Sequence, residues 1–159
     1  MIKMIWCEDI NHGIGLNNKL PWNIPEEMKH FRTTTLNQTI LCGDKTFISW
    51  GGKPLPNRKN IILTIDKLFK APNNCIVYND LHQFIKDYKN EKVYICGGKT
   101  IYKLFFPFAN ELIITTLNKS YECNIFMNFP LHEFVCFKSI KHKDFTINYY
   151  KRNTPICNK

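Results

Sequence analysis

One stretch decides the predicted fold of this chain: Leu20-Pro21-Trp22-Asn23-Ile24-Pro25-Glu26-Glu27-Met28-Lys29-His30-Phe31-Arg32. Pro25 suits the first position of a helix, where its missing N–H costs nothing, and the two glutamates after it complement the positive end of the helix dipole. We therefore predict a helix over residues 25–36. At the α-helical period its apolar arc is formed by Ile24, Met28, Phe31 and Thr35.

Glu27 lies inside this apolar arc, and no Lys or Arg stands three or four residues away to neutralise it. A buried carboxylate without a partner either takes up a proton or needs a partner from outside the helix. For an arbitrary helix, a glutamate near the start that simply faces water is the more ordinary interpretation. The rigid Leu-Pro-Trp-Asn segment before this helix favours a site instead, with Trp22 as an aromatic wall.

The composition is that of one globular domain, residues 1–159. Hydrophobic residues make up 44% and charged residues 22% of the chain, and a chain of this length buries a core without disulfides or metals. No apolar run approaches a membrane span, and the first residues lack the layout of a signal peptide. We expect a cytoplasmic protein, and a monomer because no segment has the character of an interface.

Seven cysteines and five histidines are scattered along the chain, with no C-x-x-C pair and no histidine at metal-ligand spacing. Isolated cysteines in such a protein are usually reduced and behave as small hydrophobic residues. We therefore predict free and mostly buried cysteines and no metal site.

The net charge of +9 has three interpretations. A nucleic-acid binder would gather its basic residues in a stripe, whereas these lysines are dispersed, so we expect no nucleic-acid partner. Electrostatic steering of anionic small molecules is a second interpretation. The third, a lysine-rich composition without functional meaning, best explains most of the surface. Nucleic-acid binding stays testable through the salt dependence of single-stranded DNA affinity.

Short apolar segments alternate with helical ones along most of the chain. Strands are predicted at residues 3–8, 39–42, 60–64, 75–78, 93–96, 111–117, 134–142 and 145–152, and helices at residues 25–36, 44–50, 81–89 and 99–106, the last closed by Pro107. The last two strands form a hairpin around Lys143-Asp144. These patterns predict an α/β fold: a predominantly parallel central sheet of about eight strands with an antiparallel C-terminal hairpin strand, flanked by about four helices.

Two strand-to-helix junctions have the geometry of anion sites, because backbone N–H groups at a helix start face the ligand. One follows Gly43, where Lys45 and Thr46 add a charge and a hydroxyl, and the other begins at Lys99. Residues 9–23 form a long loop without periodicity, which is typical of a lid. Gly13 and Gly15 in this loop are too few for a dinucleotide fingerprint.

Five motifs, in this order and spacing, resemble the dihydrofolate reductase family over nearly the whole chain. They are Gly13-Ile14-Gly15-Leu16-Asn17-Asn18, Leu20-Pro21-Trp22, the helix with Glu27 and Phe31, Pro54-Leu55-Pro56-Asn57-Arg58-Lys59-Asn60, and Ile95-Cys96-Gly97-Gly98-Lys99-Thr100-Ile101-Tyr102. The resemblance implies NADPH-dependent reduction of dihydrofolate to tetrahydrofolate, by hydride transfer from nicotinamide to pterin C6, in one-carbon metabolism and thymidylate synthesis. Dihydrofolate, NADPH and antifolate inhibitors are the partners that it implies.

The resemblance assigns catalytic roles to Glu27, which would support protonation at pterin N5, and to Trp22, which would orient a water. An ordinary core tryptophan remains the alternative for Trp22. Arg58 would grip the glutamate α-carboxylate of folate with its planar fork, and an exposed salt-bridging arginine is the alternative. The substrate-binding residues that the resemblance implies are Ile5, Cys7, Glu27, Met28, Phe31, Ile48, Ser49, Leu55, Arg58, Cys96 and Thr115.

For the cofactor, the Gly97-Gly98 pair matches a glycine pair that the family joins by a cis peptide bond. The resemblance also implies that Cys7, Ile14 and Tyr102 frame the nicotinamide. The full set of implied cofactor-binding residues is Cys7, Ile14, Gly15, Leu20, Gly43, Asp44, Lys45, Thr46, Thr64, Ile65, Cys96, Gly97, Gly98, Lys99, Thr100, Ile101 and Tyr102.

The chain departs from the family pattern at the adenosine end. Asp44 stands where an arginine is common, Ile65 and Asp66 replace a serine and a polar or basic residue, and Thr100 replaces a possible basic contact. An acid near the ribose disfavours a 2′-phosphate. We therefore expect NADPH with a weakened preference over NADH, unless a lysine at position 45, 67 or 99 compensates.

Two further points bear on the assignment. Cys123-Asn124 replaces a glycine and an acid that help to hold the lid, residues 11–23, in the family. A related reductase of the riboflavin-pathway type is the alternative enzyme, and the combination of Trp22, Glu27 and Arg58 favours folate over it.

Overall fold

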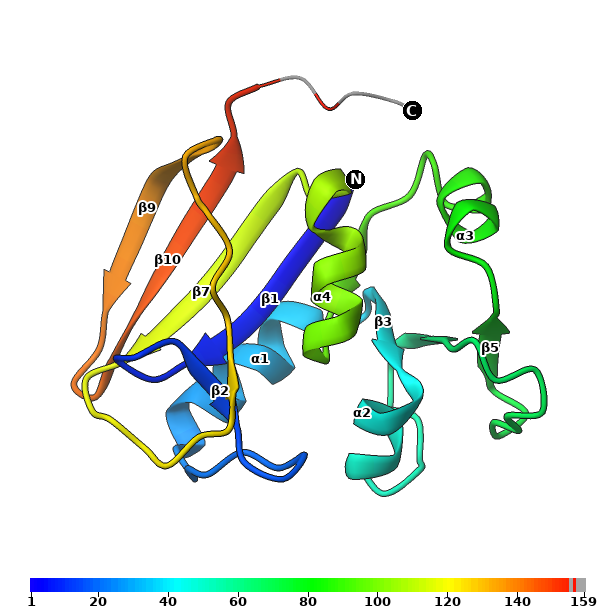
Figure 1. Ribbon diagram of the computed structural model, residues 1–159, viewed down its shortest axis with the longest axis horizontal. Helices are drawn as coiled ribbons and strands as arrows, with labels where there is room; N and C mark the ends of the chain where they lie inside the picture. The colour runs from blue at the N-terminus through cyan, green and yellow to red at the C-terminus, as the bar shows by residue number, and fades with distance from the viewer. Residues whose placement is uncertain (155, 157–159) are drawn as a thin grey trace.

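The computed structural model describes residues 1–154 and 156 and has one eight-stranded sheet, in the order β5-β4-β3-β6-β1-β7-β10-β9 (Figure 1). Its strands are β1 (Ile2–Glu8), β3 (Thr39–Gly43), β4 (Lys59–Leu63), β5 (Cys75–Tyr78), β6 (Val93–Ile95), β7 (Glu111–Leu117), β9 (Phe134–Lys141) and β10 (Phe145–Arg152). The helices are α1 (Pro25–Thr35), α2 (Asp44–Ser49), α3 (Leu81–Asp87) and α4 (Lys99–Phe105).

The pairing of the strands confirms the predicted fold class. The six strands from β5 to β7 are parallel neighbours, whereas β10 pairs antiparallel with both β7 and β9. The β9–β10 hairpin turns at Lys143-Asp144, as predicted. Only β10 therefore runs against the other strands of this sheet, because the tight turn of the hairpin reverses the chain between β9 and β10.

Two features differ from the sequence prediction. The loop over residues 9–23 contains a short strand, β2 (Gly13–Gly15), which pairs with β8 (Ile125–Phe126). Strands of two or three residues are too short for alternation to reveal them. α4 stops before Pro107, one residue earlier than predicted, and continues into a 3₁₀ turn, Phe106–Phe108, where the missing N–H of Pro107 is not needed.

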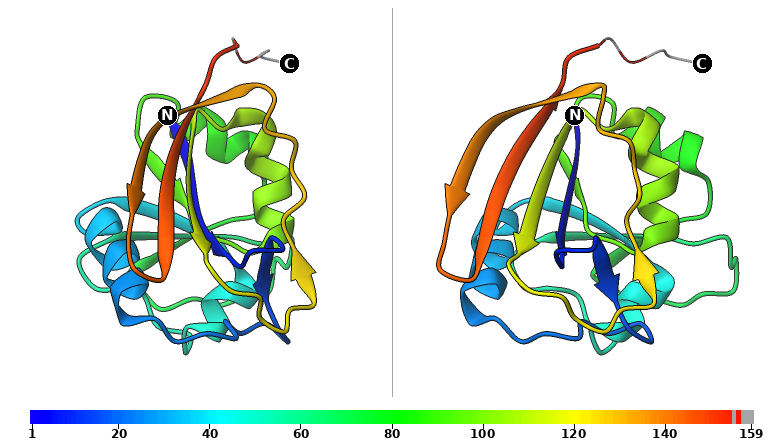
Figure 2. Two further views of the ribbon diagram at one scale, coloured as in Figure 1. Left: turned by 90° about the vertical axis from the view of Figure 1, so that its left-hand side faces the viewer. Right: turned by 60° about the vertical axis from the view of Figure 1, so that its left-hand side comes forward.

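Strand alternation divides the core between the two faces of the sheet, which Figure 2 shows nearly edge-on. Met4 and Trp6 point to the face that packs against α4, and Ile5 and Cys7 point to the face that packs against α1. Since β1 is flanked by β6 and β7 near the middle of the sheet, its carboxyl end is surrounded by other strand ends. This end carries the candidate site.

The six described cysteines are free, but only Cys42 and Cys96 are buried, so the prediction that most are buried is wrong. Cys75 and Cys136 lie on the two edge strands, where a side chain has neighbours on one side only. Cys157 lies outside the described residues. None of the described helices is long and apolar enough to cross a membrane, and the described residues contain no group of three or more His, Cys, Asp or Glu that could hold a metal ion.

Asn60 on β4 holds the loop that carries Leu55 and Arg58. Its Oδ1 accepts from the Leu55 N–H at 3.0 Å, and its Nδ2 donates to the carbonyls of Leu55 and Arg58 at 2.9 and 3.1 Å. Asn60 is only 4% exposed, so water does not readily replace these bonds.

We predict that Asn60→Ala lowers the free energy of unfolding by about 1–3 kcal/mol, because it leaves three partly buried backbone groups without partners. Urea denaturation measures this loss. Asn73→Ala, in an exposed loop, is the matched control, and an equal effect of the two substitutions would contradict the role given to Asn60.

Candidate active site

Glu27 is the buried acid of the site. Its side chain lies on the first turn of α1, and the residue is 7% exposed, whereas its apolar neighbour Met28 is 51% exposed. Burial raises the pKa of Glu27 to about 7, and an interaction with the Cys7 side chain lowers it by less. The helix therefore hides a carboxyl group and exposes an apolar side chain, which is the reverse of ordinary helix burial.

Among the described residues, three buried side-chain polar atoms have no protein partner: His30 Nε2 and, near Glu27, Trp22 Nε1 and Thr115 Oγ1. Thr115 on β7 pairs in register with Cys7 on β1, so both side chains point to the α1 face. Trp22 belongs to the same cluster as Ile5, Cys7 and Phe31. Buried polar groups are nearly always hydrogen-bonded, so these orphans mark a place where a ligand or water binds.

The other residues predicted for the substrate lie around this face. Ile5 is buried, Cys96 is buried with its Sγ 3.5 Å from the Tyr94 carbonyl, and Leu55 packs at the rim of the cluster. Phe31 of α1 meets Trp50, which follows α2, with ring centroids 6.4 Å apart. Ile48 is 62% exposed, and the Ser49 hydroxyl donates to the Thr46 carbonyl of its own helix at 2.6 Å.

Arg58 is anchored by hydrogen bonds to the protein itself. Nε donates to Thr35 Oγ1 at 3.2 Å, and the two terminal nitrogens donate to the Pro56 and Arg32 carbonyls at 2.6 Å each. Among the described residues it forms no ion pair, so the alternative of a salt-bridging arginine is not observed. Three of the five N–H donors of a guanidinium are thus used, and one remains on each terminal nitrogen.

The predicted cofactor residues gather where β3 and β6 end and α2 and α4 begin. The Gly43 N–H donates to the Gly97 carbonyl at 2.9 Å, and the Gly97–Gly98 peptide bond is cis, as expected. A Cβ on Gly43 would lie 2.9 Å from the Ile101 side chain, and one on Gly98 would lie 3.2 Å from Thr46 Oγ1. A side chain at Gly43 or Gly98 would therefore crowd Ile101 or Thr46.

Tyr102 connects this glycine group to the central strand. Its hydroxyl donates to the Ile5 carbonyl at 2.6 Å, and its ring lies 5.5 Å from that of Trp6. Tyr102 is therefore both a core residue and a neighbour of the predicted site. Lys99 and Thr100 at the start of α4 are exposed.

At the predicted adenosine end, Asp44 and Thr64 satisfy each other. The Thr64 hydroxyl donates to Asp44 Oδ2 at 2.9 Å and accepts from the Asp66 N–H at 3.1 Å. Ile65 is 94% exposed, and Lys45 and Lys67 are exposed. The hydroxyl of Thr64 is thus already occupied by an acid in a region where the resemblance expects phosphate ligands.

The lid is attached to residues 120–124. Asn124 replaces an acid but still bonds the lid: its Oδ1 accepts from the Asn17 N–H at 3.2 Å, and its N–H donates to the Gly15 carbonyl at 2.9 Å. Asn17 and Asn18 both have positive φ, which suits the tight turn between Leu16 and Lys19. Ile14 packs against the α4-side core, whereas Leu20 is 55% exposed.

Comparison with known proteins agrees with this arrangement. The sequence model of a family described as dihydrofolate reductase matches residues 1–157. The dihydrofolate reductase of Ureaplasma parvum is 40% identical over 150 residues, which are 94% of this chain and 96% of that protein. The chain belongs to the dihydrofolate reductase family. This reductase is an NADPH-dependent oxidoreductase that acts on dihydrofolate.

Two further matches are a solved structure with the same fold and a longer protein that contains a similar sequence. A structure of Enterococcus faecalis dihydrofolate reductase complexed with NADP(H) and RAB-propyl superposes with a TM-score of 0.89 at 26% identity, covering 97% of each chain. Part of the segregation and condensation protein A of Mycoplasmoides gallisepticum is 36% identical over 154 residues, which are 96% of this chain but 26% of that protein. A reductase-like sequence therefore also occurs inside a longer protein.

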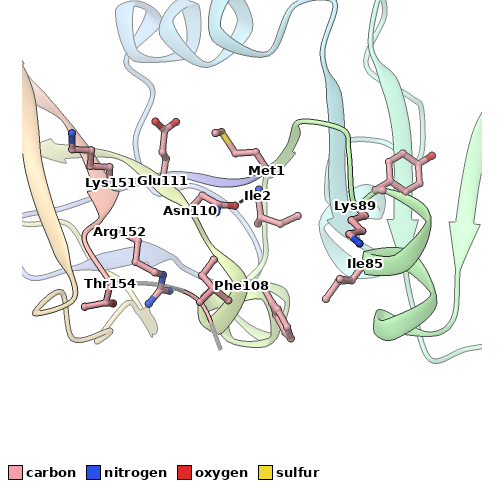
Figure 3. Close-up of a pocket in the computed structure, with 12 residues that line it drawn as sticks. Met1, Ile2, Ile85, Lys89, Phe108, Asn110, Glu111, Lys151, Arg152 and Thr154 are labelled. Carbon is pink, nitrogen blue, oxygen red and sulfur yellow. Dashed lines mark hydrogen bonds between the residues drawn. The ribbon is translucent and has the colours of Figure 1, made fainter. Parts of the chain in front are cut away.

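A separate cavity of about 550 Å³ lies at the opposite end of the central strands (Figure 3). Its walls include Ile2, Asn110 and Arg152, and none of its lining residues was predicted for the site. Sequence analysis also missed Asp9, whose carboxylate accepts from the Tyr121 N–H, and Tyr121, whose ring meets Trp22. Both contacts join segments far apart in the sequence, so no local pattern indicates them.

The raised pKa of Glu27 predicts a pH-dependent cost in stability. An acid whose pKa rises from 4.5 to about 7 on folding disfavours the folded state increasingly as the pH rises through this range. Glu27→Gln removes the charge, so its free energy of unfolding should exceed that of the wild type by up to about 3 kcal/mol at pH 8.

This excess should shrink as the pH falls toward the unfolded-state pKa of the carboxyl group. Urea unfolding at several pH values between 4.5 and 8 measures it. Glu26→Gln is the matched control because the Glu26 side chain is 73% exposed. A pH-independent difference between Glu27→Gln and the wild type would contradict the assignment of the raised pKa to Glu27.

Proposed function

We propose that Glu27 is the acid that supports protonation of dihydrofolate at N5. The observation that carries this proposal is a buried carboxyl group with a pKa of about 7 beside two unpartnered buried polar atoms, Trp22 Nε1 and Thr115 Oγ1. Acid catalysis is most effective when the pKa lies near the working pH. The polar edge of a ring bound here would form hydrogen bonds with the Glu27 carboxyl group, Trp22 Nε1 and Thr115 Oγ1.

In this mechanism the chain binds and orients the pterin, and Glu27 favours its protonation at N5. The Glu27 carboxylate accepts from the pterin 2-amino and N3 groups, and Thr115 Oγ1 offers a further hydrogen bond at that edge. Trp22 Nε1 donates to a water that carries the proton to N5. NADPH, when bound, supplies the hydride to C6. The apolar surroundings of Ile5 and Phe31 exclude other water and keep the proton transfer local.

Arg58 binds the glutamate α-carboxylate of the substrate in this proposal. The bonds to Thr35, Pro56 and Arg32 fix the plane of its guanidinium. A carboxylate that meets the remaining N–H groups forms charge-assisted hydrogen bonds with little further ordering. Met28 and Ile48, which are exposed, would be covered by the substrate.

The candidate cofactor-binding residues fit the pyrophosphate of NADPH better than its 2′-phosphate. Gly43, Gly97 and Gly98 place backbone without side chains at two helix starts, next to the Thr46 hydroxyl. At the adenosine end, Asp44 holds the Thr64 hydroxyl, and its negative charge repels a phosphate. We therefore infer a weakened preference for NADPH over NADH.

We also propose that residues 1–159 act as one reductase domain and as a monomer, and that antifolates compete for the Glu27 site. A basic ring that binds a buried carboxylate gains a charge-assisted hydrogen bond there. Light scattering tests the monomeric state, and competitive inhibition of dihydrofolate reduction tests antifolate binding. Neither nucleic acid nor membrane is needed as a partner in this proposal.

Glu27→Gln should lower the rate of dihydrofolate reduction at pH 7 by about a hundredfold or more, because it removes the ionisable group. The dissociation constant for dihydrofolate should change far less. Stopped-flow single turnovers, followed through reduced-nicotinamide absorbance, give the rate across pH 5 to 9. Glu26→Gln should retain the wild-type profile, and near wild-type turnover in Glu27→Gln would falsify the role of Glu27.

Asp44→Asn should raise the NADPH-over-NADH ratio of kcat/KM by about five- to tenfold, because one negative charge near the ribose is worth about 1 kcal/mol in water-exposed surroundings. Steady-state assays with both nucleotides measure the ratio. Asp144→Asn, in the exposed β9–β10 turn, is the control. A wild-type ratio in the thousands would show that the lysines already compensate for Asp44.

A further inference from the structure

Asp9, the residue that follows β1, is a buried carboxylate that the proposed mechanism does not use. It is 1% exposed. Its Oδ1 accepts from the N–H groups of Asn11 at 2.9 Å and Gly13 at 2.8 Å, and its Oδ2 accepts from the N–H of Tyr121 at 2.8 Å. Burial works to raise the pKa of Asp9, but these hydrogen bonds outweigh it and lower the pKa. The group is therefore charged at neutral pH.

The three donors belong to two segments that are distant in the sequence. Asn11 and Gly13 lie where the lid begins, whereas Tyr121 lies in the segment between β7 and β8. The packing between these segments is tight, because a Cβ on Gly13 would lie 2.5 Å from Cys123 Sγ and 3.1 Å from Asp9 Oδ1. One carboxylate thus fixes both segments at a single point.

The side chain of Tyr121 contacts Trp22. The two rings meet edge to face, with centroids 5.4 Å apart and planes at 63°. Trp22 is 8% exposed, and its indole N–H has no protein partner. The Trp22 ring thus packs against Tyr121, and the backbone N–H of Tyr121 is bound by the Asp9 carboxylate.

We propose that Asp9 is a positioning residue for the reaction, which acts through Tyr121 to hold the Trp22 indole N–H in its working orientation. This inference rests on the proposed function in so far as it concerns the reaction. The linkage from Asp9 to Trp22 exists without substrate, so it can be tested separately. Misplacing a group that orients a reactant by about 1 Å costs up to a hundredfold in rate.

Fluorine NMR of the protein labelled with 5-fluorotryptophan tests the linkage in the absence of substrate and cofactor. The chain has three tryptophans, Trp6, Trp22 and Trp50, whose resonances are assigned by single Trp→Phe substitutions. Asp9→Asn replaces one acceptor oxygen by an NH₂ group that faces a backbone donor. We expect it to shift or broaden the Trp22 resonance and leave that of Trp50 in place.

Single-turnover kinetics test the effect on the reaction. Asp9→Asn should slow dihydrofolate reduction about tenfold while the dissociation constant for dihydrofolate changes by less than about twofold. Trp22→Phe should have its own effect, and adding Asp9→Asn to it should cost little more, because the two residues act in one chain. Additive effects of the two substitutions would overturn the proposal.

Two further variants separate positioning from general destabilisation. Tyr121→Leu keeps the backbone N–H that Asp9 binds but removes the ring, so it should reproduce both effects of Asp9→Asn, even if Asp9→Asn fails to fold. Glu133→Gln removes the ion pair with Arg152 at the opposite end of the strands and should change neither the Trp22 resonance nor the single-turnover rate.

The outcomes distinguish this proposal from the proposed function. A wild-type Trp22 resonance in Asp9→Asn and Tyr121→Leu overturns the linkage, whatever the activity. If the wild type reduces dihydrofolate and both variants shift the Trp22 resonance but keep the wild-type rate, the catalytic part alone is overturned. If the wild type does not reduce dihydrofolate, the proposed function fails, and the positioning role in catalysis fails with it.

Discussion

A carboxyl group that leaves water must be compensated, and Glu27 is compensated only in part by the protein. Its neighbours are the Cys7 side chain and an apolar cluster, and no cation lies within reach along its helix. The fold tolerates this because a pKa near neutrality lets the group become uncharged when nothing binds it. The loop before α1, the strand ends beneath it and the fixed arginine at its edge are arranged around this one group.

The central strand distributes the chemistry between the two faces of the sheet. Alternate residues of β1 point to α1 and to α4, so one strand supplies Cys7 to the acid site and Trp6 to the packing of Tyr102. Tyr102 in turn bonds the Ile5 carbonyl and stands beside Gly97. The two halves of the site are therefore joined through a single strand, and a displacement of β1 would disturb both.

The sequence predicted most of the sheet and helices, because proline and glycine positions and apolar periods are local signals. The start of α1 at Pro25 and the bounds of β5, β7 and β10 agree with the prediction. The pairing of β2 with β8, the clamp by Asn60 and the contact of Tyr121 with Trp22 could not be predicted, since each depends on residues that only folding brings together. The burial of Glu27 was predicted from its helical arc, but the orphaned Thr115 hydroxyl became visible only with the register of β1 and β7.

Arg58 illustrates how a binding group can be prepared in advance. A free arginine side chain samples many rotamers, and freezing it when a ligand arrives costs conformational entropy. Here the carbonyls of Arg32 and Pro56 and the hydroxyl of Thr35 have already restricted it. A carboxylate that binds this guanidinium meets a rigid receptor rather than a flexible one, so its binding is expected to be dominated by enthalpy, and the loss of freedom has been transferred from the binding step to the folding of the chain.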